Sequence, residues 1–267
     1  MRLVWLFVAA FVAGLSCTAQ QPTSDAALLA KARALYDAPF TRGLISFDCA
    51  VQFQWKQHFI DAQRFINPSR SVAPQAVSAA EKLQTVAHRV FVDRSGAAVS
   101  AVPNAPDLMG IAHADELEQV FRVMVKGGLD TWMPFATNVI LPMGPTKYEF
   151  EKIDTGYKVA LSGDNLSATL VLNPGLGIVS GNALRPQSYQ FNTEFTLGPD
   201  GYLLQSISTG SSPGGWATFN YTYQTVQGIQ LPLEITVKPS TSEAWRYSLS
   251  GCKIVKGIVV KVGPPKH

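Results

Sequence analysis

Apolar and polar residues alternate along most of the chain from residue 147 to residue 262. In the clearest run, 219–237, the side chains of Phe219, Tyr221 and Tyr223 share one face of an extended strand, with polar residues between them. After a Gln-Gly turn the alternation resumes with leucine, isoleucine and valine. Strands with one apolar face need a cover for that face. The cover is either the protein's own core or a bound ligand.

The alternation predicts nine strands, separated by short turns that are rich in glycine, proline, aspartate and asparagine. They cover residues 147–153, 157–163, 166–172, 190–197, 201–209, 216–226, 229–237, 244–251 and 253–262. Because such short connections join antiparallel neighbours, we expect one meandering antiparallel sheet.

The first part of the chain mixes helical and strand patterns. Apolar residues at helical spacing predict helices over 24–37 and 75–88, and alternation predicts a strand over 44–55. A hairpin is expected over 89–102, with its turn at Arg94-Ser95-Gly96. The range 56–74 is polar and contains proline, so it is predicted as a loop.

The segment before the strands predicts a pair of helices that are too apolar to lie free in solvent. A helix is predicted from Asp115, with Gly127 and Gly128 ending it, and a second helix from Asp130. The segment from Leu129 to Met143 carries many large apolar side chains, which would form a large exposed patch in solvent. We therefore expect it to cover the concave face of the sheet.

These patterns predict a mainly β (α+β) fold in one domain over residues 20–267. The expected architecture is a curved antiparallel sheet or unclosed barrel, with an N-terminal helix and further helices covering the concave face.

The N-terminal residues 1–19 predict a secretory signal peptide, with Arg2, a following apolar run and small residues before Ala19. That run is too short to cross a bilayer as a helix. Cleavage after Ala19 predicts a periplasmic or secreted protein, and lipid attachment at Cys17 is the alternative. The formal net charge of +3 provides no basic stripe, so nucleic acid is not an expected partner.

Removing the signal peptide leaves only two cysteines, Cys49 and Cys252. Two cysteines in an exported chain predict a disulfide between the first strand and the last. The alternation opposes this pairing, because Cys252 falls on the face opposite Trp245 and Tyr247 unless Gly251 forms a bulge. Two buried free thiols are the alternative.

The sequence contains no recognisable catalytic motif. The four histidines lack metal-ligand spacing, and the H-E-x-x-H, C-x-x-C and G-x-S-x-G patterns are absent. The stretch from Asn173 to Gly177 has no lysine and no following helix, so it predicts a turn and not a phosphate-binding loop. We predict no enzymatic activity, no metal and no cofactor.

Eight aromatic residues are the candidates for lining an apolar groove. They are Phe53, Trp55, Trp132, Phe135, Phe219, Tyr221, Tyr223 and Tyr247. Their spacing also fits an ordinary closed core. The tyrosine hydroxyls need hydrogen-bond partners, which favours a partly wet groove wall.

The order of these features resembles the LolA-like half-barrel superfamily of periplasmic lipoprotein carriers. The resemblance rests on the helix "ALLAKARALYD" followed by "LISFDCAVQFQW", and on residues of the C-terminal strands. These residues are Phe195, Leu197, Asp200, Gly201, Leu203, Gly228 and Pro232. The resemblance implies a curved antiparallel sheet whose concave face, partly plugged by helices, holds acyl chains. The chain departs from the carriers by extra material between Lys56 and Pro145.

Two functions are expected from this reasoning. In the first, an exported protein binds a lipid, an acyl chain or another apolar small molecule in a half-barrel groove, with an envelope protein as a partner. In the second, the chain is a non-catalytic secreted interaction or structural β domain with a closed core.

Overall fold

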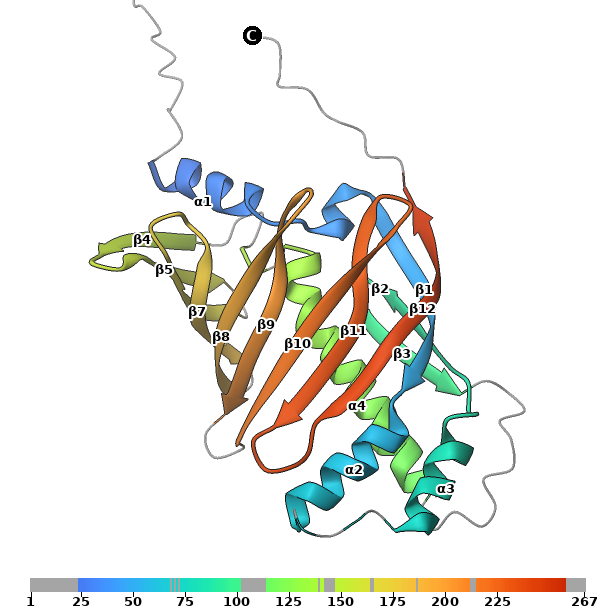
Figure 1. Cartoon of the computed structure of the whole chain (residues 1–267). Coiled ribbons are helices and arrows are strands. Elements are labelled where there is room, and N and C mark those ends of the chain that lie inside the picture. The colour runs from blue at the N-terminus through green and yellow to red at the C-terminus, as the bar shows by residue number, and fades with distance from the viewer. Residues whose placement is uncertain are drawn as a thin grey trace, which may run out of the picture.

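A single curved sheet of twelve antiparallel strands makes up most of the molecule (Figure 1). The structure, a computed structural model, describes residues 24–67, 69, 71, 73–101, 114–138, 140–141, 147–163, 166–185, 187–211 and 215–257. The order of strands is β3-β2-β1-β12-β11-β10-β9-β8-β7-β6-β5-β4. The edge strands β3 and β4 do not pair with each other, so the sheet is not closed into a barrel. The predicted fold class is confirmed.

The strands form two groups that meet where the first strand pairs with the last. Strands β1, β2 and β3 form one group, strands β4 to β12 form a meander, and β1 pairs with β12. The bounds are β1 Leu44–Phe53, β2 His88–Asp93, β3 Gly96–Ala101, β4 Lys147–Ile153, β5 Gly156–Gly163, β6 Leu166–Leu172, β7 Ile178–Arg185, β8 Gln187–Gly198, β9 Gly201–Ser211, β10 Gly215–Val226, β11 Ile229–Pro239 and β12 Trp245–Lys256.

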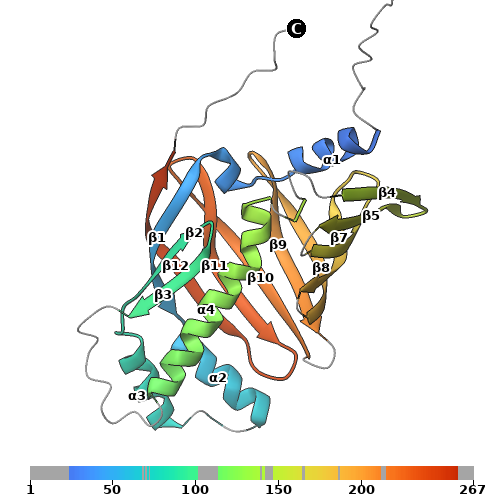
Figure 2. The same cartoon turned by 180° about the vertical axis from the view of Figure 1, so that it is seen from behind.

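One long helix, α4 (Ala114–Ala136), crosses the concave face of the sheet (Figure 2). Helix α1 (Ser24–Ala34) and the 3₁₀ turn η1 (Pro39–Arg42) lie at one end of the sheet. Helices α2 (Trp55–Ile66) and α3 (Pro74–Leu83) lie at the other end. Helical cover of the concave face is therefore confirmed. No helix in the described part of the chain is long and apolar enough to cross a membrane.

The helices correct two predictions. The range 56–74, predicted as a loop, contains most of α2. The sequence pattern misses this helix because a polar residue, His58, takes one of its core positions: His58 is only 4% exposed and lies beside Trp55. Gly127 and Gly128 do not end a helix, since α4 continues through both residues to Ala136. Glycine in a helix interior costs only about 1 kcal/mol relative to alanine, which packing of the apolar face of α4 exceeds.

The strands correct two more. Strand β7 (Ile178–Arg185) is not predicted by the alternation, because a glycine interrupts its apolar face. The Cβ of any other residue at Gly181 would lie 2.5 Å from Cζ of Phe191 on the neighbouring strand. The two strands predicted over 244–262 form one strand, β12, and residues 258–262 lie outside the described residues.

The predicted disulfide joins Cys49 of β1 to Cys252 of β12. The register shifts at this point, because Asp48 pairs with Lys253 and Ala50 with Ser250. Two residues of β12 therefore oppose one residue of β1, and Gly251 has the left-handed φ of +56° that this bulge needs. The bulge turns Cys252 toward Cys49, which resolves the conflict with the alternation.

Several predictions fall outside the described residues. They concern the signal peptide over 1–19, the lipid attachment at Cys17, and Val139 and Met143 of the covering segment. In the part of that segment that the structure describes, Leu129, Trp132, Met133, Phe135, Ala136 and Leu141 are buried, and Ile140 is half-buried.

Candidate functional site

A cavity of about 520 Å³ lies between the second half of α4 and the inner face of strands β5, β6, β8 and β9. Figure 2 shows β7, β8 and β9 beside α4 on this side of the helix. The cavity is lined by Gly127, Asp130, Thr131, Pro134, Phe135, Ile140, Leu161, Ala168, Leu170, Tyr189, Phe191, Ile207 and Thr209. We call this side of the molecule the open half.

The strand wall of the cavity is built from inward-pointing apolar residues. Leu161 of β5 pairs with Ala168 of β6, and Phe191 of β8 pairs with Thr209 of β9. Alternate residues of a strand point to the same face, so these pairs place their side chains side by side. Leu161, Phe191 and Ile207 are each at most 5% exposed. The wall is therefore apolar and largely shielded from solvent.

The helix wall comes from one stripe of α4. Gly127, Thr131 and Pro134 recur at helical spacing and line the cavity together with Phe135. A Cβ added to Gly127 would meet no atom within 4 Å, so this position leaves open space. The Thr131 hydroxyl donates to the backbone oxygen of Gly127 at 2.7 Å and keeps its acceptor capacity.

Four of the lining residues bring polar groups to the cavity: Asp130, Thr131, Tyr189 and Thr209. The carboxylate of Asp130 accepts a hydrogen bond from the backbone N–H of Ala97 on the edge strand β3, with N and Oδ1 3.0 Å apart. Its other oxygen pairs with Lys126, one helical turn earlier. The carboxylate is thus held at the free edge of β3, and Asp130 is also one of the residues that line the cavity. Tyr189 is 40% exposed, so the cavity opens to solvent beside it.

Seven of the eight aromatic groove candidates lie outside this cavity. Only Phe135 lines it. Phe53, Trp55, Trp132, Phe219, Tyr221 and Tyr247 are buried and belong to the packed core, against which the half-buried Tyr223 packs. We call the strands β1, β2 and β10 to β12, with α2 and the face of α4 that covers them, the closed half.

Backbone carbonyls satisfy the tyrosine hydroxyls in the closed half. Tyr221 donates to the oxygen of Gly128 at 2.8 Å, and Tyr247 donates to the oxygen of Val125 at 3.2 Å. Both acceptors belong to α4. Burial raises the pKa of both tyrosines well above the usual range, so they stay protonated as donors. These hydroxyls, which we predicted to face a wet groove, hold the helix on the sheet.

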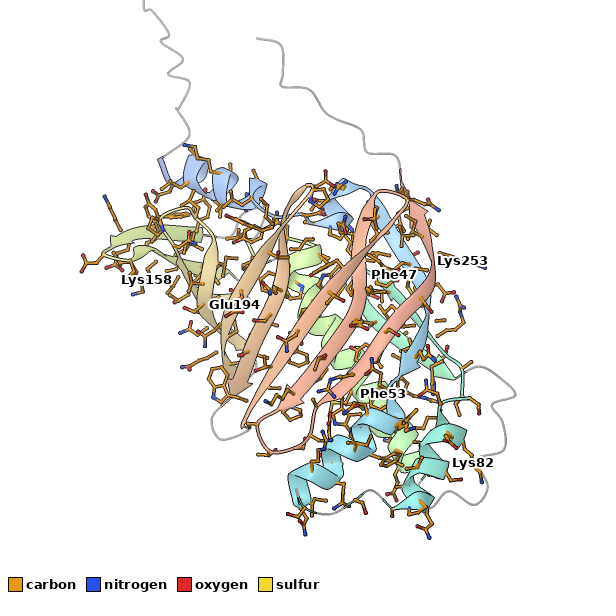
Figure 3. The ribbon with its side chains drawn as sticks, in the orientation of Figure 1. Phe47, Phe53, Lys82, Lys158, Glu194 and Lys253 are labelled. Carbon is orange, nitrogen blue, oxygen red and sulfur yellow. A yellow bond between two sulfur atoms is a disulfide. The ribbon has the colours of Figure 1, made fainter. Side chains whose placement is uncertain are left out.

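Aromatic rings fill the closed half where α2 meets α4. The ring of Phe53 lies 4.4 Å from that of Trp55 and 5.1 Å from that of Phe121, between centroids. Figure 3 shows Phe53 toward α2 and α3, and Phe47 further along the same strand. The ring of Phe47 lies 6.1 Å from that of Trp132. This packing leaves Phe53 and Trp55 with at most 3% of their surface exposed.

A second recess, of about 590 Å³, lies at the start of β1. It is lined by Phe40, Gly43, Leu44, Ile45, Asp93, Arg94, Ser95 and Gly257. This recess is larger but more open, and its lining carries both a carboxylate and a guanidinium. The cavity beside α4 encloses more apolar surface, and it is the candidate site.

The described residues contain no group of three or more potential metal ligands. His58 and His88 are both buried, and each lies near a glutamate: Glu243 for His58 and Glu118 for His88. His58 Nε2 lies 3.3 Å from Glu243, and the pKa of His88 responds to Glu118. The arrangement provides a binding cavity and no assembled nucleophile and base among these residues.

Comparisons with protein-family models, with curated proteins and with solved structures found no match for this chain. The candidate site therefore rests on geometry alone.

The alternation places about half of the lining residues. Six belong to predicted strands, and their inward direction follows from the alternation: Leu161, Ala168, Leu170, Phe191, Ile207 and Thr209. The alternation does not predict the position of α4, which decides the part of the concave face that the helix leaves uncovered. The adjacent glycines of α4 could have indicated this position, because one of them lines the cavity.

Proposed function

We propose that this protein binds a lipid or another apolar ligand with a long alkyl or acyl chain, in the cavity between α4 and strands β5, β6, β8 and β9. The observation that carries the proposal is the enclosed apolar wall of a cavity of about 520 Å³. Cavities that hold small ligands measure roughly 300–1,000 Å³ and are lined mainly by apolar side chains with a few polar groups. The polar groups of Asp130, Thr131 and Thr209 meet the second part of that description.

Simple energetics set the length of such a ligand. Burial of each methylene contributes about 0.8 kcal/mol, so a chain of about sixteen carbons gains about 13 kcal/mol before costs. Association costs at least about 4 kcal/mol, which leaves micromolar affinity within reach. A chain of half that length would bind weakly.

The same proposal places the protein in an oxidising compartment, as an exported binding protein related to the LolA-like half-barrels. The pairing of Cys49 with Cys252 supports this location, because disulfides persist mainly outside the reducing cytosol. The unclosed antiparallel sheet with a helix on its concave face supports the relationship.

The alternative function is a secreted interaction or structural domain with a closed core. The burial of Tyr221 and Tyr247 favours it, because α4 covers the face of the sheet that bears them. The two functions differ in whether the open half takes up a ligand.

Native mass spectrometry tests the proposal on the full mature chain. The protein is purified from the cells that produce it, and its mass is measured before and after organic extraction. Extraction should remove the mass of a bound apolar ligand. Incubation of the extracted protein with a C16 lipid should then add the mass of that lipid. Ala168→Phe fills the cavity from β6 and should weaken binding at least about tenfold, since overpacking a binding wall excludes the ligand.

Ala160→Phe is the matched control, because Ala160 neighbours Leu161 on β5 but is exposed on the opposite face. It should bind as the unchanged protein does. Gly127→Leu fills the cavity from α4 and provides a second test if Ala168→Phe does not fold. Undiminished binding by both folded cavity variants, or no uptake by the unchanged protein, rejects the proposal.

A further inference from the structure

We infer that the cavity selects ligands whose polar head is uncharged, such as a long-chain alcohol or a monoacylglycerol, over free fatty acids. This inference rests on the proposed function and deepens it, because it concerns the chemical class of the ligand. It starts from the charges that line the cavity.

Among the described residues that line the cavity, Asp130 is the only one with a full charge. None of these described lining residues is a lysine, an arginine or a histidine. A carboxylate head drawn into this space would lose hydration without gaining a cationic partner, and it would face the carboxylate of Asp130. Burying an unpaired charge costs far more than burying a neutral polar group that is hydrogen-bonded.

A cationic head is also disfavoured, because the charge of Asp130 is already paired with that of Lys126. One carboxylate oxygen pairs with Lys126, and the other accepts the N–H of Ala97. A cationic ligand would compete with Lys126, which lies on the same helix and pays no cost of association. The ion pair thus leaves the cavity mouth close to neutral.

Neutral hydrogen-bonding groups remain for a ligand head to use. The hydroxyl of Thr209 lines the cavity and forms no hydrogen bond with any residue that the structure describes. Thr131 donates to Gly127, so its oxygen is left as an acceptor. The carboxylate oxygens of Asp130 accept from hydroxyls as well. A head with one or two hydroxyl groups matches this set.

Two variants with opposite effects on charge test the inference. Asp130→Asn removes the negative charge, retains an oxygen that can accept the Ala97 N–H, and leaves Lys126 without its partner. Lys126→Gln removes the positive charge and leaves Asp130 uncompensated, at a side chain that is 54% exposed. Asp130→Asn is nearly isosteric, Lys126→Gln shortens an exposed side chain, and thermal unfolding checks that each variant is folded.

Isothermal titration calorimetry should compare 1-monopalmitoylglycerol with palmitate at pH 8 and low salt, below their aggregation concentrations. We expect the unchanged protein to bind the neutral lipid at least about tenfold more tightly. Asp130→Asn should reduce this ratio several-fold, and Lys126→Gln should increase it, because a nearby charge acts on the carboxylate alone. Added salt should shrink both changes.

Each result has a separate meaning. Equal affinity for the two lipids in the unchanged protein, or a ratio that neither variant moves, overturns the selection of neutral heads and leaves the proposed function in place. Tighter binding of palmitate overturns it as well. Failure of both lipids to bind the unchanged protein rejects the proposed function itself.

Discussion

Two adjacent glycines of α4 face opposite halves of the sheet and meet different surroundings. A Cβ added to Gly128 would lie 2.2 Å from the hydroxyl oxygen of Tyr247 and 3.1 Å from Ile235. A Cβ added to Gly127 would meet nothing within 4 Å. In the closed half, α4 therefore packs directly against the sheet at Gly128, which has no side chain. In the open half, a cavity lies beside Gly127.

Helix α4 both completes the core of the closed half and leaves a cavity in the open half. Because Gly128 lets α4 approach β11 and β12 closely, the hydroxyls of Tyr221 and Tyr247 reach its backbone carbonyls. The helix is thereby held toward one half of a sheet that is wider than a single helix. The strands of the other half keep apolar faces that α4 only partly covers.

The largest expected effect comes from the glycine of the closed half. Gly128→Ala should lower the free energy of unfolding by about 3 kcal/mol or more, since overpacking costs about 1–3 kcal/mol and loss of the buried Tyr247 hydrogen bond adds about 1–3 kcal/mol. Urea denaturation measures the change.

Gly127→Ala is the matched control in the open half. It should leave the free energy of unfolding unchanged or raise it by up to about 1 kcal/mol, because alanine favours the helix and meets no neighbour. Equal destabilisation by the two variants would show that the halves do not differ in packing against α4.

A smaller effect should appear on acidification, through two histidines of the closed half. Burial lowers the pKa of His58 and of His88 below the usual value near 6.5, against the opposing influence of Glu243 and Glu118. The unfolded chain then binds protons first, so stability is complete above pH 6.5 and declines as the pH falls below it. Each histidine contributes at most about 1.4 kcal/mol per pH unit.

Urea denaturation between pH 7.5 and pH 5.5 measures this decline, and His88→Gln should make it shallower. His88 packs on Phe121 of α4, with ring centroids 4.8 Å apart, and its Nδ1 has no partner among the described residues. Stability that rises on acidification would contradict the burial of neutral histidines in the closed half. Ligand binding in the open half should change less than stability does.

The sequence predicts most of the sheet because alternation depends only on neighbouring residues. It predicts β4 to β6 and β8 to β11, and it identifies a bulge at Gly251 as the condition under which Cys49 and Cys252 can pair. It misses β7, where Gly181 makes room for Phe191 of another strand, and it misses α2, where His58 takes a buried position. In both cases a distant contact decides the role of the residue.

The candidate site is harder to predict, because it depends on where α4 lies across the sheet. The tyrosines at 221 and 247 have the same pattern whether their hydroxyls meet a ligand or a helix carbonyl. In a sequence, a Gly-Gly pair is typical of a helix end. Here Gly127 and Gly128 lie inside α4, and Gly128 packs closely against the sheet while Gly127 has open space beside it. Only the packed structure distinguishes these alternatives.

Photo-crosslinking of the protein with a diazirine-bearing hexadecanol tests the central claim most directly, because it locates the ligand without changing the protein. Peptide mass spectrometry should find saturable adducts on the cavity wall, at β6, β8 and the second half of α4, that excess 1-monopalmitoylglycerol prevents. Adducts concentrated on β10 around Phe219 and Tyr221, or labelling that no competitor reduces, would contradict the assignment of the ligand to the open half.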